Sequence, residues 1–181
     1  GDTTEPKVTV NSSLTRDNIL KLLDAIDPDG AFIVRNSGGD VKWWFGSATT
    51  IGQGINRLDT AVHEQCHMYS DTPGGVRYNS VQGKYMSEKE WIYIGNGKHI
   101  EVTMTDVFPS SEMADTVPEQ LRTHRFYTYI TGDPITGSIQ FGPYGMLDEF
   151  TAYCWGVNNT IRQEGFRQGN GRIQEISEDH P

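Results

Sequence analysis

Residues 61–69 read Ala-Val-His-Glu-Gln-Cys-His-Met-Tyr, and the segment from His63 to His67 has the pattern H-E-x-x-H. Apolar residues recur in and before it at steps of three and four: Ile55, Leu58, Val62 and Cys66. This period predicts an amphipathic helix over 55–69. Side chains four residues apart lie on the same side of a helix, so the two imidazoles can converge on one ion. The spacing suits a zinc site.

Glu64 supplies a second chemical group at this site. It directly follows the first histidine, close enough to hold a metal's water yet angled away from ligation, as a general base must be. Zinc lowers the pKa of such a water toward neutrality, and Glu64 would take its proton. Chance gives on the order of one H-E-x-x-H per hundred sequences of this composition. If the motif arose by chance, His63 and His67 are instead an ordinary histidine pair that is exposed to solvent or packed in the core.

A catalytic zinc needs a third protein ligand and an open fourth position. The longer metzincin pattern is absent, because Ser70 and Pro73 stand where it would have glycine and histidine. Four candidates remain downstream: His99, His124, Asp148 and Glu149. The two histidines lie in less regular segments and are more typical of a surface. Asp148 and Glu149 both also fit the ordinary preference of acids for the first turn of a helix.

Residues 149–152, Glu-Phe-Thr-Ala, follow Asp148 and resemble the second zinc motif of gluzincin metallopeptidases. They are similar to the E-F-x-A segment of the anthrax lethal factor catalytic domain and of the related Pro-Pro endopeptidases. The resemblance covers only the two helical motifs, roughly a sixth of the chain. The resemblance implies a zincin-like fold and a zinc-dependent peptidase that cleaves within a peptide or protein chain. It also implies Glu149 as the third zinc ligand.

Peptide hydrolysis also needs a donor to the oxyanion that develops on the scissile carbonyl. The lethal-factor-like families carry a tyrosine seven residues before the glutamate ligand, but position 142 here is Gly. The nearest tyrosine, Tyr144, is therefore the candidate. Tyr127 and Tyr129 are rivals, and all three tyrosines could instead pack in the core or at its rim.

Length and charge limit the remaining possibilities. A chain of 181 residues suits one compact domain, and we expect residues 1–12 and 168–181 to be flexible. The net charge of −9, with no basic block, argues against a nucleic acid partner. No apolar run approaches the roughly 20 residues that span a bilayer. The polar start without Met suggests a trimmed chain, from which any signal sequence would have been removed. The leading hypothesis, which follows from the peptidase chemistry, is a bacterial protein that is secreted or on the cell surface.

Two other classes of function remain open. One is a cell-surface binding module that keeps the zincin scaffold and a structural zinc, although such a site has no need of Glu64. The other is an intracellular metalloenzyme that processes one regulatory partner. Cys66 and Cys154 lie on the two helices that the metal would join; they could form a disulfide, but two buried free thiols are the favoured interpretation.

The remaining pattern predicts an α+β fold with a small mixed sheet. Helices are expected over 18–26, over 118–121 and from Leu147 to near Gly165, while 126–130 fits either a helix or a strand. Hairpins are expected over 31–45 and over 91–104, the second turning at Gly95-Asn96-Gly97. In the first hairpin, Trp43 and Trp44 would lie where zincins commonly place an edge strand that binds substrate, but the favoured interpretation is that the two adjacent tryptophans divide between core and surface.

Overall fold

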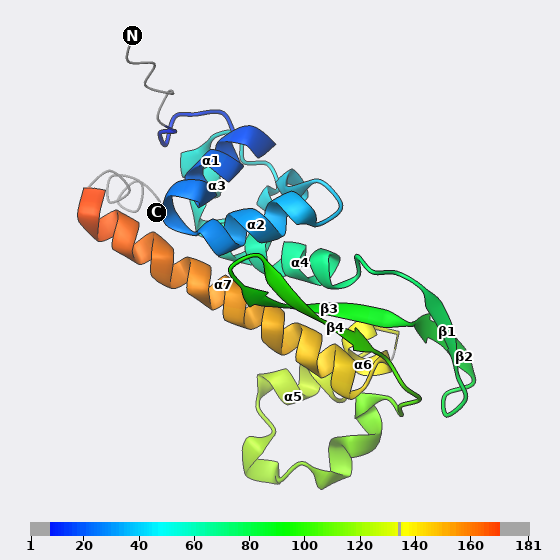
Figure 1. The fold of residues 1–181 in the computed structure, drawn as a ribbon. Helices are drawn as coiled ribbons and strands as arrows, with labels where there is room; N and C mark the ends of the chain where they lie inside the picture. Colours follow the sequence, from blue (N-terminus) through cyan, green and yellow to red (C-terminus); the bar gives the residue numbers. More distant parts are fainter. Residues whose placement is uncertain (1–7, 134, 171–181) are drawn as a thin grey trace. The chain divides into compact units, whose positions relative to one another are not determined.

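The structure is a computed structural model that describes residues 8–133 and 135–170 (Figure 1). Its packing divides the chain into two compact units: Gly1–Tyr69 with Ala152–Pro181, and Ser70–Thr151. The long helix α7 (Pro143–Asn170) begins in the second unit and continues into the first. No helix within the described ranges is long and apolar enough to cross a membrane.

The expected flexible ends fall largely on residues outside the description. Residues 1–7 and 171–181 are not described, while 168–170 belong to α7. The assignment of the whole chain to a single domain stays a prediction.

Helix α1 (Arg16–Ile26) confirms the first predicted helix. Thr15 caps it, because its hydroxyl accepts a hydrogen bond from the backbone N–H of Asn18 at 3.2 Å. Its apolar side is buried: Ile19, Leu22, Leu23 and Ile26. The sequence therefore contained both the cap and the buried face of this helix.

The hairpin predicted over 31–45 is wrong. Its first half belongs to α2 (Pro28–Asn36), and its second half is the 3-10 helix η1 (Val41–Phe45). Asp27 caps α2 by accepting from the backbone N–H of Gly30 at 3.1 Å, with Pro28 next to it. The stretch 27–30, which directly follows α1, is thus a helix start, since a capping Asp followed by Pro suits the first turn.

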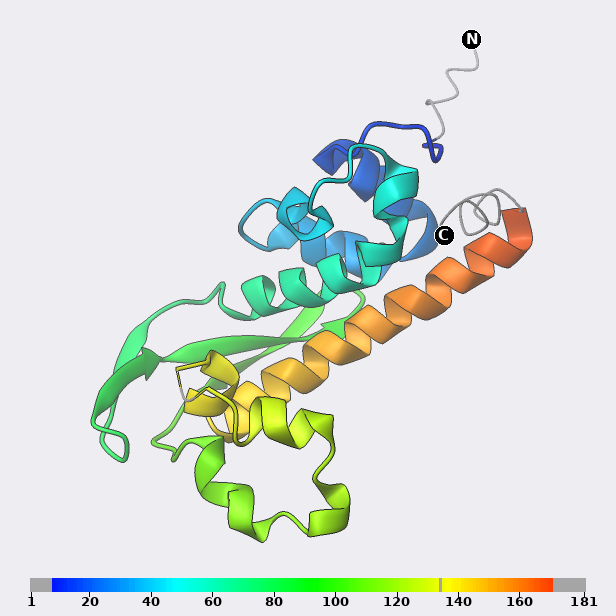
Figure 2. The same ribbon diagram turned by 180° about the vertical axis from the view of Figure 1, so that it is seen from behind.

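Helix α4 (Leu58–Ser70) confirms the predicted H-E-x-x-H helix, which begins three residues later than expected. It follows the short helices α3 (Ile51–Gly54) and η2 (Ile55–Arg57). Fully buried side chains on α4 join those of α1 and α2 in the core of the first unit: Leu58, Ala61, Val62 and Cys66. Figures 1 and 2 show α4 running alongside the middle of α7, in the opposite direction.

The strands of the second unit form two separate antiparallel hairpins in the described residues, rather than the mixed sheet we expected. Strand β1 (Val76–Asn79) pairs with β2 (Lys84–Ser87), and β3 (Lys89–Gly95) pairs with β4 (Lys98–Thr103). The second pair confirms the hairpin predicted over 91–104. Asn96 has a φ of 53° between two glycines of positive φ, which is the turn chemistry that this sequence offers.

Short helices complete the second unit. The bounds are η3 (Ser110–Thr116), η4 (Glu119–Leu121), α5 (His124–Tyr129) and α6 (Gly137–Gln140). The predicted helix after Pro118 is confirmed as a 3-10 turn, and the undecided stretch 126–130 is helical up to Tyr129. The final predicted helix is confirmed within α7, although Gly165 does not end it. The coarse α+β class is therefore confirmed.

Candidate metal centre

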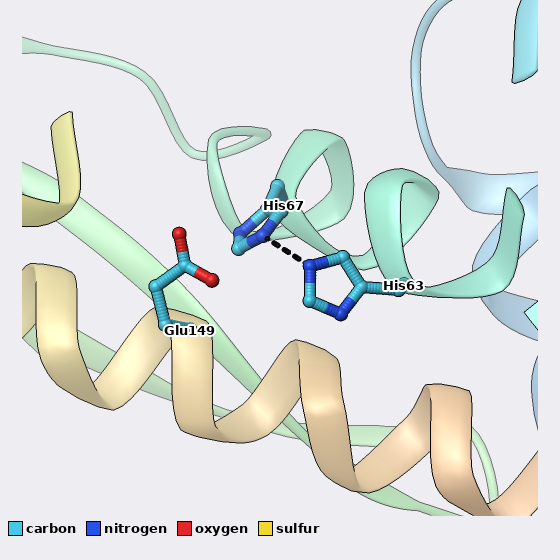
Figure 3. Close-up of side chains that lie close together, drawn as sticks. All are labelled: His63, His67 and Glu149. Atoms are coloured by element: carbon cyan, nitrogen blue, oxygen red, sulfur yellow. Dashed lines mark hydrogen bonds between the residues drawn. The ribbon is translucent and has the colours of Figure 1, made fainter. Parts of the chain in front are cut away.

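His63 and His67 project from the same side of α4, one turn apart. Their Nε2 atoms lie 3.1 Å from each other, and the two rings meet at 82° (Figure 3). Both side chains are half-buried, while their neighbours Val62 and Cys66 are fully buried. The core face of α4 thus fixes the helix so that the histidine pair faces away from the core of α1 and α2.

The separation of the two nitrogens can be compared with the geometry of zinc. Zn–N bonds of about 2.05 Å at a tetrahedral angle place two ligand nitrogens about 3.3 Å apart. The observed 3.1 Å between the Nε2 atoms of His63 and His67 is close to that value. The spacing of the two Nε2 atoms is therefore compatible with both histidines binding one ion.

Helix α7 packs antiparallel against α4, as contacts along both helices show. Near the start of α4, the Thr160 hydroxyl donates to an Asp59 carboxylate oxygen at 3.4 Å. One turn further, a Cβ on Gly156 would lie 3.3 Å from the Asp59 carbonyl oxygen and 3.4 Å from the Cβ of His63. The Tyr153 ring then meets the His63 ring at 4.5 Å between centroids. Moving from Asp59 toward His67 therefore means moving from Thr160 toward the start of α7.

Glu149 lies on the same line of α7, one turn before Tyr153 and two turns before Gly156. The register of α4 and α7 thus carries its carboxylate toward His67. One ligand atom from each of His63, His67 and Glu149 lies within 4.8 Å of the others (Figure 3). Two imidazole nitrogens and a carboxylate oxygen are donors that zinc prefers. The three predicted ligands are thus brought together in a group that could hold this metal.

Glu64 lies beside this group on α4. Its side chain is half-buried, and it makes no hydrogen bond or ion pair with any other described residue. It is one residue from His63, so it points about 100° around the helix from that ligand. Because the Glu64 carboxylate has no hydrogen-bond or ion-pair partner among the described residues, it can accept a proton from a water molecule.

The other candidate ligands lie elsewhere. His99 is exposed on β4 and stacks on the Trp91 ring at 4.1 Å, and His124 is exposed at the start of α5. Asp148 precedes Glu149 on α7 and is half-buried. None of the three belongs to a metal-binding group among the described residues, where the set of His63, His67 and Glu149 is found.

Tyr144, the candidate oxyanion donor, is held by Thr105. Its hydroxyl lies 3.0 Å from the Thr105 hydroxyl and accepts from the Thr105 backbone N–H at 3.2 Å. Of its rivals, Tyr127 is exposed, and Arg125 donates to the Tyr129 hydroxyl at 3.5 Å. The structure thus gives Tyr144 a definite partner, and its role in chemistry stays a prediction.

Two interpretations of other side chains are corrected. Cys66 is buried but Cys154 is exposed, and both are free, so the disulfide is not formed and only one thiol is buried. Trp43 is 80% exposed and Trp44 half-buried on η1, a 3-10 helix. The edge strand that the less favoured interpretation placed at these tryptophans is therefore absent from this segment.

Tyr153 and Gly156 are site residues that the sequence reasoning missed. Tyr153 packs on His63, and the missing side chain of Gly156 lets α7 approach α4 closely. A signal was available: both lie on the line of α7 that contains Glu149, at helical steps of four and three. The apolar period of α7 instead marks a different line of the helix, which contains Phe150 and Val157.

Comparison with known family models, with curated proteins and with solved structures found no match for this chain.

Proposed function

We propose that this chain is a zinc-dependent peptidase with a zincin-like domain of the gluzincin type. His63, His67 and Glu149 would hold the zinc. The observation that carries this proposal is the 3.1 Å approach of the two Nε2 atoms within reach of the Glu149 carboxylate. Glu64 separates this proposal from a purely structural metal site, which needs no base next to its first ligand.

The chemistry is divided between the metal and the side chains. A bound zinc would polarise the scissile carbonyl and lower the pKa of a water molecule at the open position. Glu64 accepts the proton of the attacking water and passes it to the departing amine, so one carboxylate acts first as base and then as acid. Tyr144 is the proposed donor to the carbonyl oxygen as negative charge develops there. Tyr153 holds the His63 ring through its edge-to-face contact.

The wider setting follows from the same proposal. The substrate is a protein or peptide, cleaved within the chain, and the enzyme works outside a bacterial cell or on its surface. The acidic charge of −9 favours a substrate that is not nucleic acid.

Glu64→Gln tests the catalytic role and separates it from metal binding. The amide keeps the size of the side chain but cannot take a proton, so we expect one zinc per chain, an unchanged fold and cleavage of a peptide library slower by at least about 1,000-fold. Glu119→Gln, at an exposed acid on η4, is the matched control and should cleave like the parent.

Metal content and activity together separate the competing functions. Zinc in the parent that is lost in His63→Ala and His67→Ala, without cleavage of any peptide by the parent, would identify a binding module. Equal cleavage by Glu64→Gln and the parent would remove Glu64 from the mechanism. Equal zinc in the histidine variants and the parent would place the metal elsewhere.

A further inference from the structure

The side of α7 that faces away from α4 carries an exposed apolar stripe, called here the α7 seam. It consists of Leu147, Phe150, Cys154, Val157 and Ile161. Phe150 is 67% exposed, Ile161 66%, Val157 56% and Leu147 39%, and Cys154 is also exposed. The inner side of the same helix has its own buried line: Ala152, Gly156, Asn159 and Gln163. The fold therefore covers one side of α7 and leaves an apolar side bare.

The extent of the α7 seam exceeds that of scattered surface side chains. Exposed at these fractions, its large side chains leave an apolar patch on the order of 500 Å², near the size of the largest patch on a typical monomer, which is often functional. The seam also covers two consecutive heptads of one straight helix. A surface of this kind is usually covered by another macromolecule.

The spacing of the α7 seam indicates the shape of what covers it. Its members follow one another at steps of three, four, three and four, the pattern by which one helix packs along another. The positions beside them are neutral: Met146, Thr151, Tyr153, Asn158 and Thr160. A helix that packs on the seam therefore meets no charge at its edges, and two identical seams do not repel each other.

A second copy of α7 fits this seam when it runs in the opposite direction. Two members of the seam precede Cys154 and two follow it. A two-fold axis near Cys154 therefore packs Leu147 and Phe150 of one copy against Val157 and Ile161 of the other. Two such patches bury about 1,000 Å² together before the neighbouring polar atoms are counted, the lower limit for a specific interface. A membrane surface fits less well, since residues 146–161 contain no Lys or Arg and the chain has a charge of −9.

We infer that the α7 seam is the interface of a homodimer in which two copies of α7 pack antiparallel around Cys154. The members of the α7 seam lie about 80° to 160° around the helix from Glu149, so the interface does not include the line of Glu149, Tyr153 and Gly156. The dimer therefore leaves the line that faces His63 uncovered and does not depend on bound zinc.

Sedimentation equilibrium of the complete chain, with and without EDTA, tests this interface together with a variant pair. Val157→Glu puts a charge into the α7 seam at an exposed position, so it should fold normally. We expect the parent to be a dimer at micromolar concentration, and Val157→Glu to dissociate at least about 100-fold more readily. Leu121→Glu makes the same chemical change at a 61% exposed residue of η4, away from the seam, and should dimerise like the parent.

Crosslinking locates the contact. Cys66 is buried, so a short bis-maleimide should join two chains through Cys154 alone, and Cys154→Ser should abolish the product. A parent that is monomeric at 100 µM would overturn the inference. If that monomer binds neutral lipid vesicles, the α7 seam contacts a membrane instead, and if its Cys154 is protected from the maleimide, another part of the same chain covers the seam. A dimer that Val157→Glu leaves intact, or that Leu121→Glu disrupts equally, would also overturn it.

Discussion

The buried side chain of Asp27 lies between α1 and α2 and links them to α7 through hydrogen bonds. Its removal should destabilise the first unit. Only 1% of the residue is exposed. Its carboxylate accepts from the backbone N–H of Gly30 at 3.1 Å, from the Asn158 amide at 3.1 Å and from the Asn159 amide at 2.8 Å. The Asn159 amide oxygen in turn accepts from Gln163 at 2.6 Å. One carboxylate thus organises donors from two helices.

The magnitude follows from the donors that Asp27→Ala would leave behind. Gly30 and Asn159 are buried, and each buried donor without a partner costs about 1–3 kcal/mol. Asn158 is half-buried and can turn to water, so its loss adds less. We expect a fall of about 3–5 kcal/mol in the free energy of unfolding, which for a chain of this length lowers Tm by about 10 °C.

Urea titration followed by circular dichroism would measure this change. Asp27→Asn should give a smaller loss of about 2–3 kcal/mol, because its amide oxygen still accepts while its NH₂ group opposes a donor. Asp24→Ala removes an exposed ion pair with Arg35 and, as the control, should cost less than about 1 kcal/mol. If Asp27→Ala and Asp24→Ala are equally stable, the reasoning about buried donors is refuted.

Three further changes test the metal group and the surface. Glu149→Ala should weaken zinc binding at least about 100-fold in competition with a chromophoric chelator; equal weakening in Asp148→Ala would contradict the assignment. Gly156→Leu should lower both Tm and zinc affinity, because its side chain would press on Asp59 and His63. Gly38→Leu, at a glycine with nothing within 4 Å of an added Cβ, should change neither. A Gly156→Leu protein that binds zinc like the parent would show that close approach of the helices is not needed. On the β3–β4 hairpin, the hydrogen bond from Lys89, followed by that from Trp91, lowers the pKa of Glu101. Lys89→Ala should raise the pKa of Glu101 toward its ordinary value in an NMR titration. Because the pKa of Glu101 is lower in the folded chain than in the unfolded one, the ion pair stabilises the parent above the unfolded pKa, and this stabilisation is lost as the pH falls through the folded pKa. An unchanged pKa in Lys89→Ala would contradict the ion pair.

Local sequence determined the elements whose signals agree with one another. Thr15 capped a run of apolar residues with a helical period, and the result was α1. Gly95-Asn96-Gly97 offered positive φ between two β-rich runs, and the result was the β3–β4 hairpin. The H-E-x-x-H spacing likewise placed His63 and His67 on one side of α4, because that relation lies within a single helix turn.

Where a local sequence pattern was compatible with both a helix and a strand, only tertiary packing decided between the two. The apolar run 31–34 fits a strand by composition, yet Asp27 is stabilised as a helix cap by two asparagines more than 130 residues away in the sequence. The same long-range packing decided which side of α7 is buried. The sequence indicated Glu149 through resemblance, but the contact of Gly156 and Tyr153 with His63 sets the register that carries Glu149 toward the histidines. No local signal encodes that register, because it depends on how closely two helices far apart in the chain can approach.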